Sequence, residues 1–267
     1  MLPIAAFPEA QLRVVRGVFT DIDDTLTTDG RLTAEAYGAM EALQDVGVAV
    51  IPITGRPAGW CDHIARMWPV SGVVGENGAF YFHYDRDVRR MNRRYVDADD
   101  VRAENRRRLM ALGADIVKAV PGAAISADQA YRETDLAIDF CEDVAPLPPE
   151  SIDRIVALMV AAGATAKVSS IHVNGWFGDY DKLTMTKLFA ADCLGVDLEQ
   201  AQGAYVFTGD SPNDAPMFAF FDNAVGVANV RDFADRLTSP PAYITAGYGG
   251  AGFAEVAALI RDAQSGG

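Results

Sequence analysis

The stretch VFTDIDDTLT, residues 18–27, decides how this chain folds. An apolar, β-branched run over residues 14–20 predicts a buried strand, and Asp21 and Asp23 follow directly after it. Residues two apart in extended backbone point the same way, so both carboxylates can face one small site at the carboxyl end of a sheet. Ligands of open α/β folds bind at that edge. Two carboxylates in one site repel each other. The site therefore needs either a bound cation or surroundings that give the two carboxyl groups different pKa values.

Around this strand, apolar segments alternate with amphipathic ones, as in the βα units of a parallel sheet. We predict further strands at residues 48–53, 70–74, 204–208, 224–227 and 242–245. Helices are expected between them, at residues 33–46, 60–67, 184–194, 215–221 and 253–263. The pattern predicts an α/β fold in three layers, with a parallel sheet between helices.

The middle of the chain has a different pattern. An arginine-rich segment, residues 83–108, precedes a predicted strand at 136–140 and a helix at 151–162, and alternating segments within 167–177 predict antiparallel strands. We therefore expect an inserted α+β domain over residues 83–178. It would interrupt a core made of residues 1–82 and 179–267.

Composition limits the possible functions. The chain has 267 residues, a formal net charge of −14 and a pI near 4.5, which argues against nucleic acid as a partner. Its three cysteines are far apart and predict no disulfide framework. No signal peptide or long apolar segment is recognisable, so we expect a cytoplasmic protein without membrane contact, either monomeric or homodimeric.

Two other predicted strands also end in polar residues. One leads into Thr54-Gly55-Arg56-Pro57, whose hydroxyl and backbone N–H groups suit phosphate oxygens. The other leads into GDSPND, which adds Asp210, Asn213 and Asp214 at the same edge. Oxygen ligands of this kind suit Mg²⁺.

Lys182 lies just before the helix that is expected ahead of Asp210, and Lys187 lies inside it. Either ammonium group could offset negative charge between a nucleophile and a transferring phosphoryl group. The sequence leaves the choice between these lysines open.

Taken together, these motifs resemble those of the haloacid dehalogenase superfamily of phosphohydrolases. DxDxT, TGR, a lysine and GDSxND occur in that family's order, and the long insertion resembles the α+β cap of its Cof-like and sucrose-phosphatase-like branch. The segments Glu76-Asn77-Gly78-Ala79 and GYGGAGF are similar to that branch as well. The resemblance implies a modified Rossmann core.

The resemblance also implies roles for individual residues. Asp21 would be the nucleophile that forms an aspartyl-phosphate, and Asp23 the general acid and base. The residues expected to hold Mg²⁺ are Asp21, Asp23 through its backbone carbonyl, Asp210 and Asp214. Those expected to bind the phosphoryl group are Thr54, Gly55, Lys182 and Asn213.

The inserted domain would recognise the leaving group of a small-molecule phosphate ester, as such caps do in this family. Ser170, His172 and Asn174 alternate along a predicted strand and share one face, which would suit a sugar or another polyol. Arg56, Glu76 and Asn77 are further candidates for substrate contact. Arg132, or one of the arginines of the 83–108 segment, is a candidate to bind a second anionic group.

The favoured interpretation is a Mg²⁺-dependent phosphatase acting on a sugar phosphate or glycosylated phosphate. A phosphomutase of the same fold would use the same Asp21 and Asp23. A catalytically weak partner-binding protein is the alternative from another class. Only 15 residues follow the formal GxGxxG in GYGGAGF, too few for a dinucleotide site.

Overall fold

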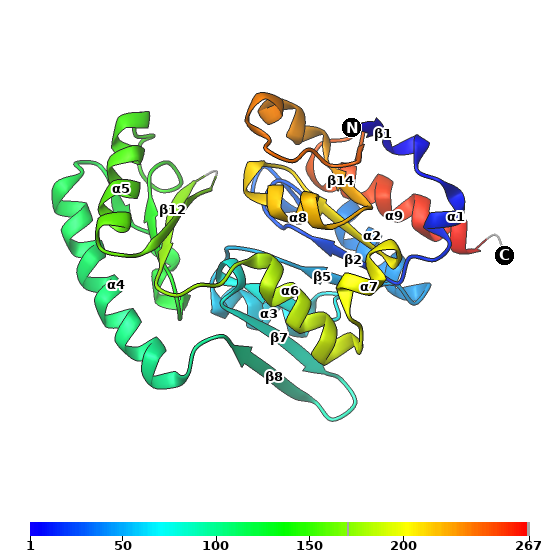
Figure 1. Ribbon diagram of the computed structural model, residues 1–267, viewed down its shortest axis with the longest axis horizontal. Helices are drawn as coiled ribbons and strands as arrows, with labels where there is room; N and C mark the ends of the chain where they lie inside the picture. Colours follow the sequence, from blue (N-terminus) through cyan, green and yellow to red (C-terminus); the bar gives the residue numbers. More distant parts are fainter. Residues whose placement is uncertain (170, 266–267) are drawn as a thin grey trace.

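The computed structural model describes residues 1–169 and 171–265, and a six-stranded parallel sheet lies at its centre (Figure 1). This confirms the predicted α/β fold with a parallel sheet. The strands follow the spatial order β1 (Leu2–Pro3), β15 (Tyr243–Ile244), β14 (Ala224–Gly226), β13 (Tyr205–Gly209), β2 (Gly17–Thr20) and β5 (Ala49–Pro52).

Helices cover both faces of this sheet because successive strand residues point to opposite sides. Val18, Val50 and Val206 pack on the side of α2 (Ala34–Asp45) and α9 (Gly249–Ser265). Phe19, Ile51 and Phe207 pack on the other side, against α6 (Lys182–Phe189) and α8 (Ala215–Phe220). Near-continuous apolar strands are the sequence signal for such a doubly covered sheet, and they placed β2, β5 and β13 correctly.

The strand predicted at residues 70–74 does not join the central sheet. It forms β6 (Val73–Gly75), which pairs antiparallel with β7 (Phe80–Asp85), and β7 pairs with β8 (Arg90–Tyr95). The chain reverses in the short helical turn Glu76–Gly78, so β6 meets β7, and a bridge between Ile53 and Val74 links it to the end of β5. Helix α3 (Ala58–Met67) precedes β6.

A four-stranded antiparallel sheet lies to one side of the core (Figure 1). It has the order β11 (Thr165–Val168), β12 (His172–Trp176), β10 (Leu136–Asp139) and β9 (Ala124–Ile125), which confirms the antiparallel strands expected within 167–177. Together with α4 (Asp99–Ala119) and α5 (Pro149–Ala161) it has its own apolar core around Ile138 and Ile155. We call this part the inserted unit.

The division of the chain into two domains at residues 83 and 178 stays a prediction. Residue 83 lies inside β7, and this strand pairs with β6 rather than with any strand of the inserted unit. The helix expected at 184–194 is α6 followed by a π-helical turn, Ala190–Leu194.

Short elements complete the described chain. They are α1 (Glu9–Leu12), α7 (Leu198–Ala201), the hairpin β3 (Thr27–Thr28) and β4 (Arg31–Leu32), and 3-10 turns at Ile4–Ala6, Ala127–Tyr131, Gln202–Ala204, Pro212–Asp214 and Ala228–Arg236. Among the described helices, none combines the length and apolar character needed to cross a membrane.

The core predicts a stability effect at β13. Phe207 is fully buried between Phe218 and Phe221, so Phe207→Ala is expected to lower the free energy of unfolding by about 3–5 kcal/mol. Chemical denaturation monitored by circular dichroism measures it. Val88→Ala, at a residue that is 67% exposed, is the control and should stay within about 0.5 kcal/mol of the wild type. An equal effect of both substitutions would contradict this account of the core.

Candidate active site

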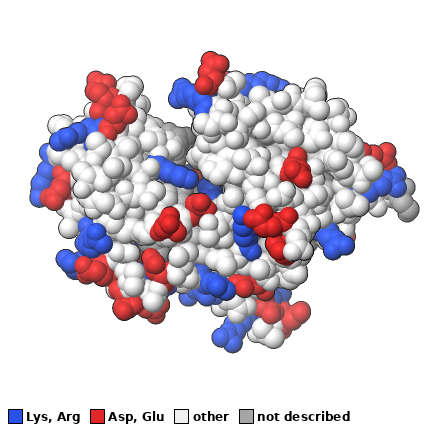
Figure 2. Space-filling model, viewed as in Figure 1, with Lys and Arg blue, Asp and Glu red and all other residues white. Residues whose placement is uncertain are grey.

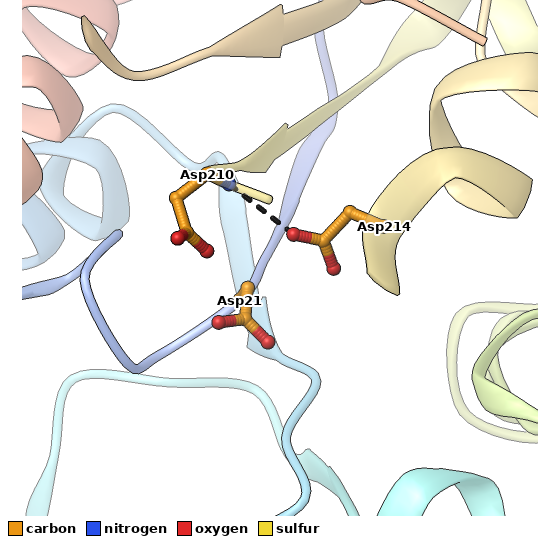
Figure 3. A group of neighbouring side chains, drawn as sticks. All are labelled: Asp21, Asp210 and Asp214. Carbon is orange, nitrogen blue, oxygen red and sulfur yellow. Dashed lines mark hydrogen bonds between the residues drawn. The ribbon is translucent and has the colours of Figure 1, made fainter. Parts of the chain in front are cut away.

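Three aspartates converge where β2 and β13 end (Figure 3). These strands are neighbours, with Thr20 opposite Thr208, so Asp21 and Asp210 leave the sheet side by side. Asp214 comes from the turn that follows β13, and its carboxylate accepts a hydrogen bond from the Asp210 N–H at 3.2 Å. All three side chains are buried, and one carboxylate oxygen from each lies within 4.8 Å of the others.

Lys182 joins this group from the first turn of α6. Its Nζ lies 2.6 Å from Asp21 Oδ1 and 3.2 Å from Asp214 Oδ1. Lys187, by contrast, pairs with Glu199 on the surface at 2.6 Å. Of the two lysines that the sequence left open, Lys182 is therefore the one that the structure brings to the carboxylates.

A glycine makes the approach of α6 possible. Gly78 has a φ of +103° and lies against the backbone of Asp181 and Lys182, where a Cβ atom would collide. Because the turn Glu76–Gly78 contacts the start of α6 so closely, the Lys182 side chain reaches the ends of β2 and β13.

Burial dominates the electrostatics of these groups. It raises the pKa of Asp21 to about 8, although Lys182 acts in the opposite direction. Burial, followed by the charges of Asp214 and Asp21, raises the pKa of Asp210 to about 9. Burial opposes the charge of Lys182, but Asp21 and Asp214 outweigh it and raise the lysine pKa, so the ammonium stays charged.

The donor set suits a hard divalent cation. Three buried carboxylates face one ammonium group, so negative charge without a partner remains unless protons or a cation bind. All the candidate ligand atoms are oxygens, which Mg²⁺ and Ca²⁺ prefer. Asp21, Asp210 and Asp214 are therefore the residues that could hold such an ion.

Asp23 lines the same pocket but is bound to Arg56 rather than to the other aspartates. Arg56 donates from Nε to both Asp23 oxygens at 3.1 Å and from Nη2 to Oδ1 at 2.8 Å. The guanidinium also lies over the Trp60 ring, 4.7 Å from its centre, and 3.5 Å from Glu142 of the inserted unit. Arg56 thus connects the proposed acid to both parts of the protein.

Phosphate-binding candidates follow β5. Thr54 is fully buried, and its hydroxyl accepts a hydrogen bond from the Arg56 N–H at 3.0 Å. Gly55 lines the pocket, and the Asn77 amide lies close above it. Asn77 Nδ2 and Asn213 Oδ1 are buried and have no hydrogen-bond partner among the described residues. Both side chains line the pocket and are available to a ligand.

The pocket has a volume of about 520 Å³ and is lined by residues of both the core and the inserted unit. Figure 2 shows the groove between them, with acidic and basic residues interspersed around it. His172 and Asn174 of β12 line it and are buried. Burial and then the charge of Arg132 lower the pKa of His172, which favours an uncharged ring. The predicted partner of these two, Ser170, lies outside the described residues.

Glu76 does not line the pocket, although it was a candidate for substrate contact. It is fully buried, and its carboxylate accepts hydrogen bonds from the N–H groups of Ala58, Glu133, Thr134 and Asp135 and from the Thr134 hydroxyl. The first donor belongs to the core and the others to the inserted unit. Glu76 therefore joins the two parts.

Arg132 lines the pocket, but its guanidinium is already engaged. It forms hydrogen bonds with Asp128 at 2.8 and 3.0 Å, with Asp135 at 3.0 Å and with the Gly55 carbonyl at 3.0 Å. This arginine orients the wall of the pocket, so it is a poor candidate for binding a second anion.

The sequence reading missed one wall of the pocket. Four residues of the turn Ala228–Arg236 line it, namely Asn229, Asp232, Phe233 and Arg236. The signal was present, because this segment follows the strand predicted at 224–227 and parallel strands end at one edge of the sheet.

Comparisons with known proteins relate this chain to a family of hydrolases. The sequence model of a family described as haloacid dehalogenase-like hydrolase matches residues 18–104. A phosphoglycolate phosphatase of Haloarcula marismortui is 28% identical over an alignment of 253 residues, and the match covers 92% of this chain and 97% of that protein.

Solved structures share the fold. A crystal structure of a Thermoplasma acidophilum protein has a TM-score of 0.71 at 16% identity and covers 92% of this chain and 98% of its own. The sucrose-phosphatase of Synechocystis, solved with sucrose and phosphate, has a TM-score of 0.62 at 17% identity and covers 93% and 98%.

The raised pKa values predict a pH-dependent response to a divalent cation. Because burial raises the pKa values of Asp21 and Asp210, to about 8 and about 9, the cation-free fold loses stability as rising pH removes their protons. A cation must displace these protons, so Mg²⁺ should raise the Tm more at about pH 8 than at about pH 6.

Thermal unfolding with Mg²⁺ and with a chelator, at both pH values, measures this response. Asp210→Asn is expected to reduce the Mg²⁺-induced shift, whereas Asp87→Asn, at an exposed residue of the β7–β8 turn, should preserve it. A shift of equal size at both pH values in the wild type would contradict the expectation.

Proposed function

We propose that this chain is a Mg²⁺-dependent phosphatase of the haloacid dehalogenase superfamily, which hydrolyses monoesters of small metabolites through an aspartyl-phosphate; the match of residues 18–104 to the sequence model of a haloacid dehalogenase-like hydrolase family supports this proposal. The observation that carries the proposal is the Lys182 ammonium between Asp21 and Asp214, next to Asp210. One nucleophile, one fixed positive charge and a cation-binding set of oxygens form a suitable site for phosphoryl transfer.

In the proposed first step, Asp21 attacks phosphorus and the bond to the leaving-group oxygen breaks. Asp23 gives that oxygen its proton, so an alcohol leaves. In the second step a water molecule attacks phosphorus, Asp23 takes its proton, and the bond to Asp21 breaks. Mg²⁺, held by Asp21, Asp210, Asp214 and the Asp23 carbonyl, would offset negative charge on the phosphoryl oxygens.

Lys182 and the residues after β5 would bind the phosphoryl group. Lys182 already contacts the proposed nucleophile, so its charge lies beside the position that an attacked phosphorus atom would occupy. The unpartnered amides of Asn77 and Asn213, with the backbone of Gly55, would supply further hydrogen bonds. These interactions would orient the phosphoryl group toward Asp21.

Arg56 gives Asp23 its position. As an acid, Asp23 must carry a proton, yet Arg56 donates to both of its oxygens. We propose that a bound ester draws Arg56 away, because a phosphoryl oxygen is a competing acceptor for the guanidinium. Binding of the substrate would then prepare the acid for the first step.

The leaving group would face β12 of the inserted unit. The His172 ring and the Asn174 amide both line the pocket, and such hydrogen-bonding groups are suited to hydroxyl groups. The solved Synechocystis relative holds sucrose and phosphate, and the Haloarcula relative is a phosphoglycolate phosphatase. Polyhydroxy phosphate esters, including sugar phosphates, are the class that we propose.

Two other functions lead to different products. A phosphomutase would move the phosphoryl group to a second sugar and release little inorganic phosphate, and a catalytically weak partner-binding protein would release none. Measurement of phosphate release against total ester consumed, over a panel of phosphate esters with Mg²⁺, separates all three.

Asp21→Asn tests the nucleophile. An amide oxygen is a far weaker nucleophile, so turnover of p-nitrophenyl phosphate with Mg²⁺ is expected to fall about a thousandfold or more. The circular dichroism spectrum and Tm serve as the control for folding, because Asn has nearly the same shape as Asp. Full activity in this variant would refute the proposed mechanism.

A matched pair of lysine variants tests the charge beside Asp21. Lys182→Met is expected to lower kcat/KM about a hundredfold or more, because a buried cation next to the reacting group is lost. Lys187→Met removes a surface ion pair with Glu199 and should change kcat/KM by less than about threefold. If both variants lost activity equally, Lys182 would have no special role.

A further inference from the structure

The pocket has a second wall that belongs to the core. It is the turn Ala228–Arg236, which lies beside the central sheet on the side facing the inserted unit (orange in Figure 1). Asn229, Phe233 and Arg236 reach the pocket from this wall, while His172 and Asn174 reach it from the inserted unit. A bound leaving group would therefore contact two walls of different chemistry.

Contacts at its beginning fix this second wall in place. Ala228 and Val230 are fully buried, Asn229 Oδ1 accepts a hydrogen bond from the Gly249 N–H at 2.8 Å, and Arg231 donates to the Thr245 carbonyl at 3.0 Å. Gly249 has a φ of +50° and lies against the backbone of Thr27. The glycine-rich segment GYGGAGF thus holds this wall in place. Its glycines have this structural role, and not the dinucleotide binding that the formal GxGxxG pattern would indicate.

Four cationic side chains line the pocket, and three of them are already paired. Lys182 contacts Asp21 and Asp214, Arg56 contacts Asp23, and Arg132 contacts Asp128 and Asp135. Arg236 makes no hydrogen bond or ion pair with any residue that the structure describes, including Asp232 on the same turn. The guanidinium carbon of Arg236 lies 5.7 Å from the centre of the Phe233 ring.

An unpaired guanidinium beside an aromatic ring is suited to a carboxylate or phosphate group, since its planar donors can bind two oxygens at once. The opposite wall offers the His172 ring, whose Nε2 lies 2.9 Å from Glu142 Oε2, and the Asn174 amide, whose Nδ2 donates to Asp135. The two walls together therefore suit a leaving group that carries both hydroxyl and anionic groups.

We propose that Arg236 binds a second anionic group on the leaving group, and that the preferred substrates are phosphate monoesters of hydroxy acids or of sugars with another phosphate. This inference rests on the proposed phosphatase function and makes its substrate class narrower. Arg236 thereby takes the role that Arg132, with its donors engaged, is unable to fill.

The test compares esters that differ only in the second anionic group. For a carboxylate the pair is 3-phosphoglycerate and glycerol 3-phosphate, and for a phosphate it is fructose 1,6-bisphosphate and fructose 1-phosphate. We expect kcat/KM in the wild type to favour the more anionic member of at least one pair by about tenfold or more. The pair that shows the preference identifies the kind of anion.

The measured quantity is the ratio of kcat/KM for the more anionic ester to kcat/KM for the other member of its pair. Arg236→Gln should bring this ratio close to one, because kcat/KM for the more anionic ester falls. Arg236→Lys should restore part of the ratio, because the charge returns without the planar donors. Arg154→Gln, at an exposed residue of α5, is the control and should keep the ratio of the wild type. A wild-type ratio near or below one in both pairs, or equal losses on both esters in Arg236→Gln, would overturn the inference.

Calorimetric binding to the Asp21→Asn protein separates this inference from the proposed function. Tighter binding of the anionic ester that disappears on adding Arg236→Gln supports the subsite, even if the wild type releases no phosphate and the proposed function is wrong. Phosphate release from p-nitrophenyl phosphate, together with no preference for the anionic ester in binding or turnover, would refute the subsite and leave the phosphatase proposal standing.

Discussion

The ion pairs of Lys182 with Asp21 and Asp214 are the interaction on which the arrangement of the site depends. Three carboxylates are buried within a few ångströms, and without a cation beside them such a group strongly destabilises a fold. The ammonium has to come from α6, so α6 must begin at the sheet edge, and Gly78 permits that close approach. These contacts therefore fix the position at which the chain returns from the inserted unit to the core, at Lys182.

A second set of buried polar contacts fixes the inserted unit against the core. Glu76 accepts hydrogen bonds from Ala58 of the core and from the backbone of residues 133–135, and Arg132 donates to the carbonyl of Gly55. The segment after β5 that we propose to bind phosphate is therefore coupled directly to the wall of the inserted unit that lines the pocket. Because a half-satisfied carboxylate in such a place is costly, these contacts favour one relative position of the two parts.

Local pattern was enough to predict β2, the two aspartates after it and the edge at which the other loops meet, because apolar strands and parallel topology determine all three. It was not enough to choose between Lys182 and Lys187, which have the same local context. Local pattern also failed to assign the role of Glu76. An acidic residue after a strand has the same sequence pattern whether its side chain contacts a ligand or backbone N–H groups. Only the tertiary contacts distinguish these cases, and they also reveal Arg236, which lies in no recognisable motif.

The charge of −14 remains to be reconciled with an anionic substrate. At physiological ionic strength the field of distant surface charges is screened over about 8 Å, so the net charge affects the encounter more than binding. Inside the pocket Lys182, Arg56 and Arg132 each contact carboxylates, so they offer little free positive charge. Attraction for a phosphate ester must then come from a cation at the aspartates, which would act on the phosphoryl end, and from Arg236, which would act on the other end. The acidic cluster would thus attract the phosphoryl end of the ester indirectly, through the cation that it holds.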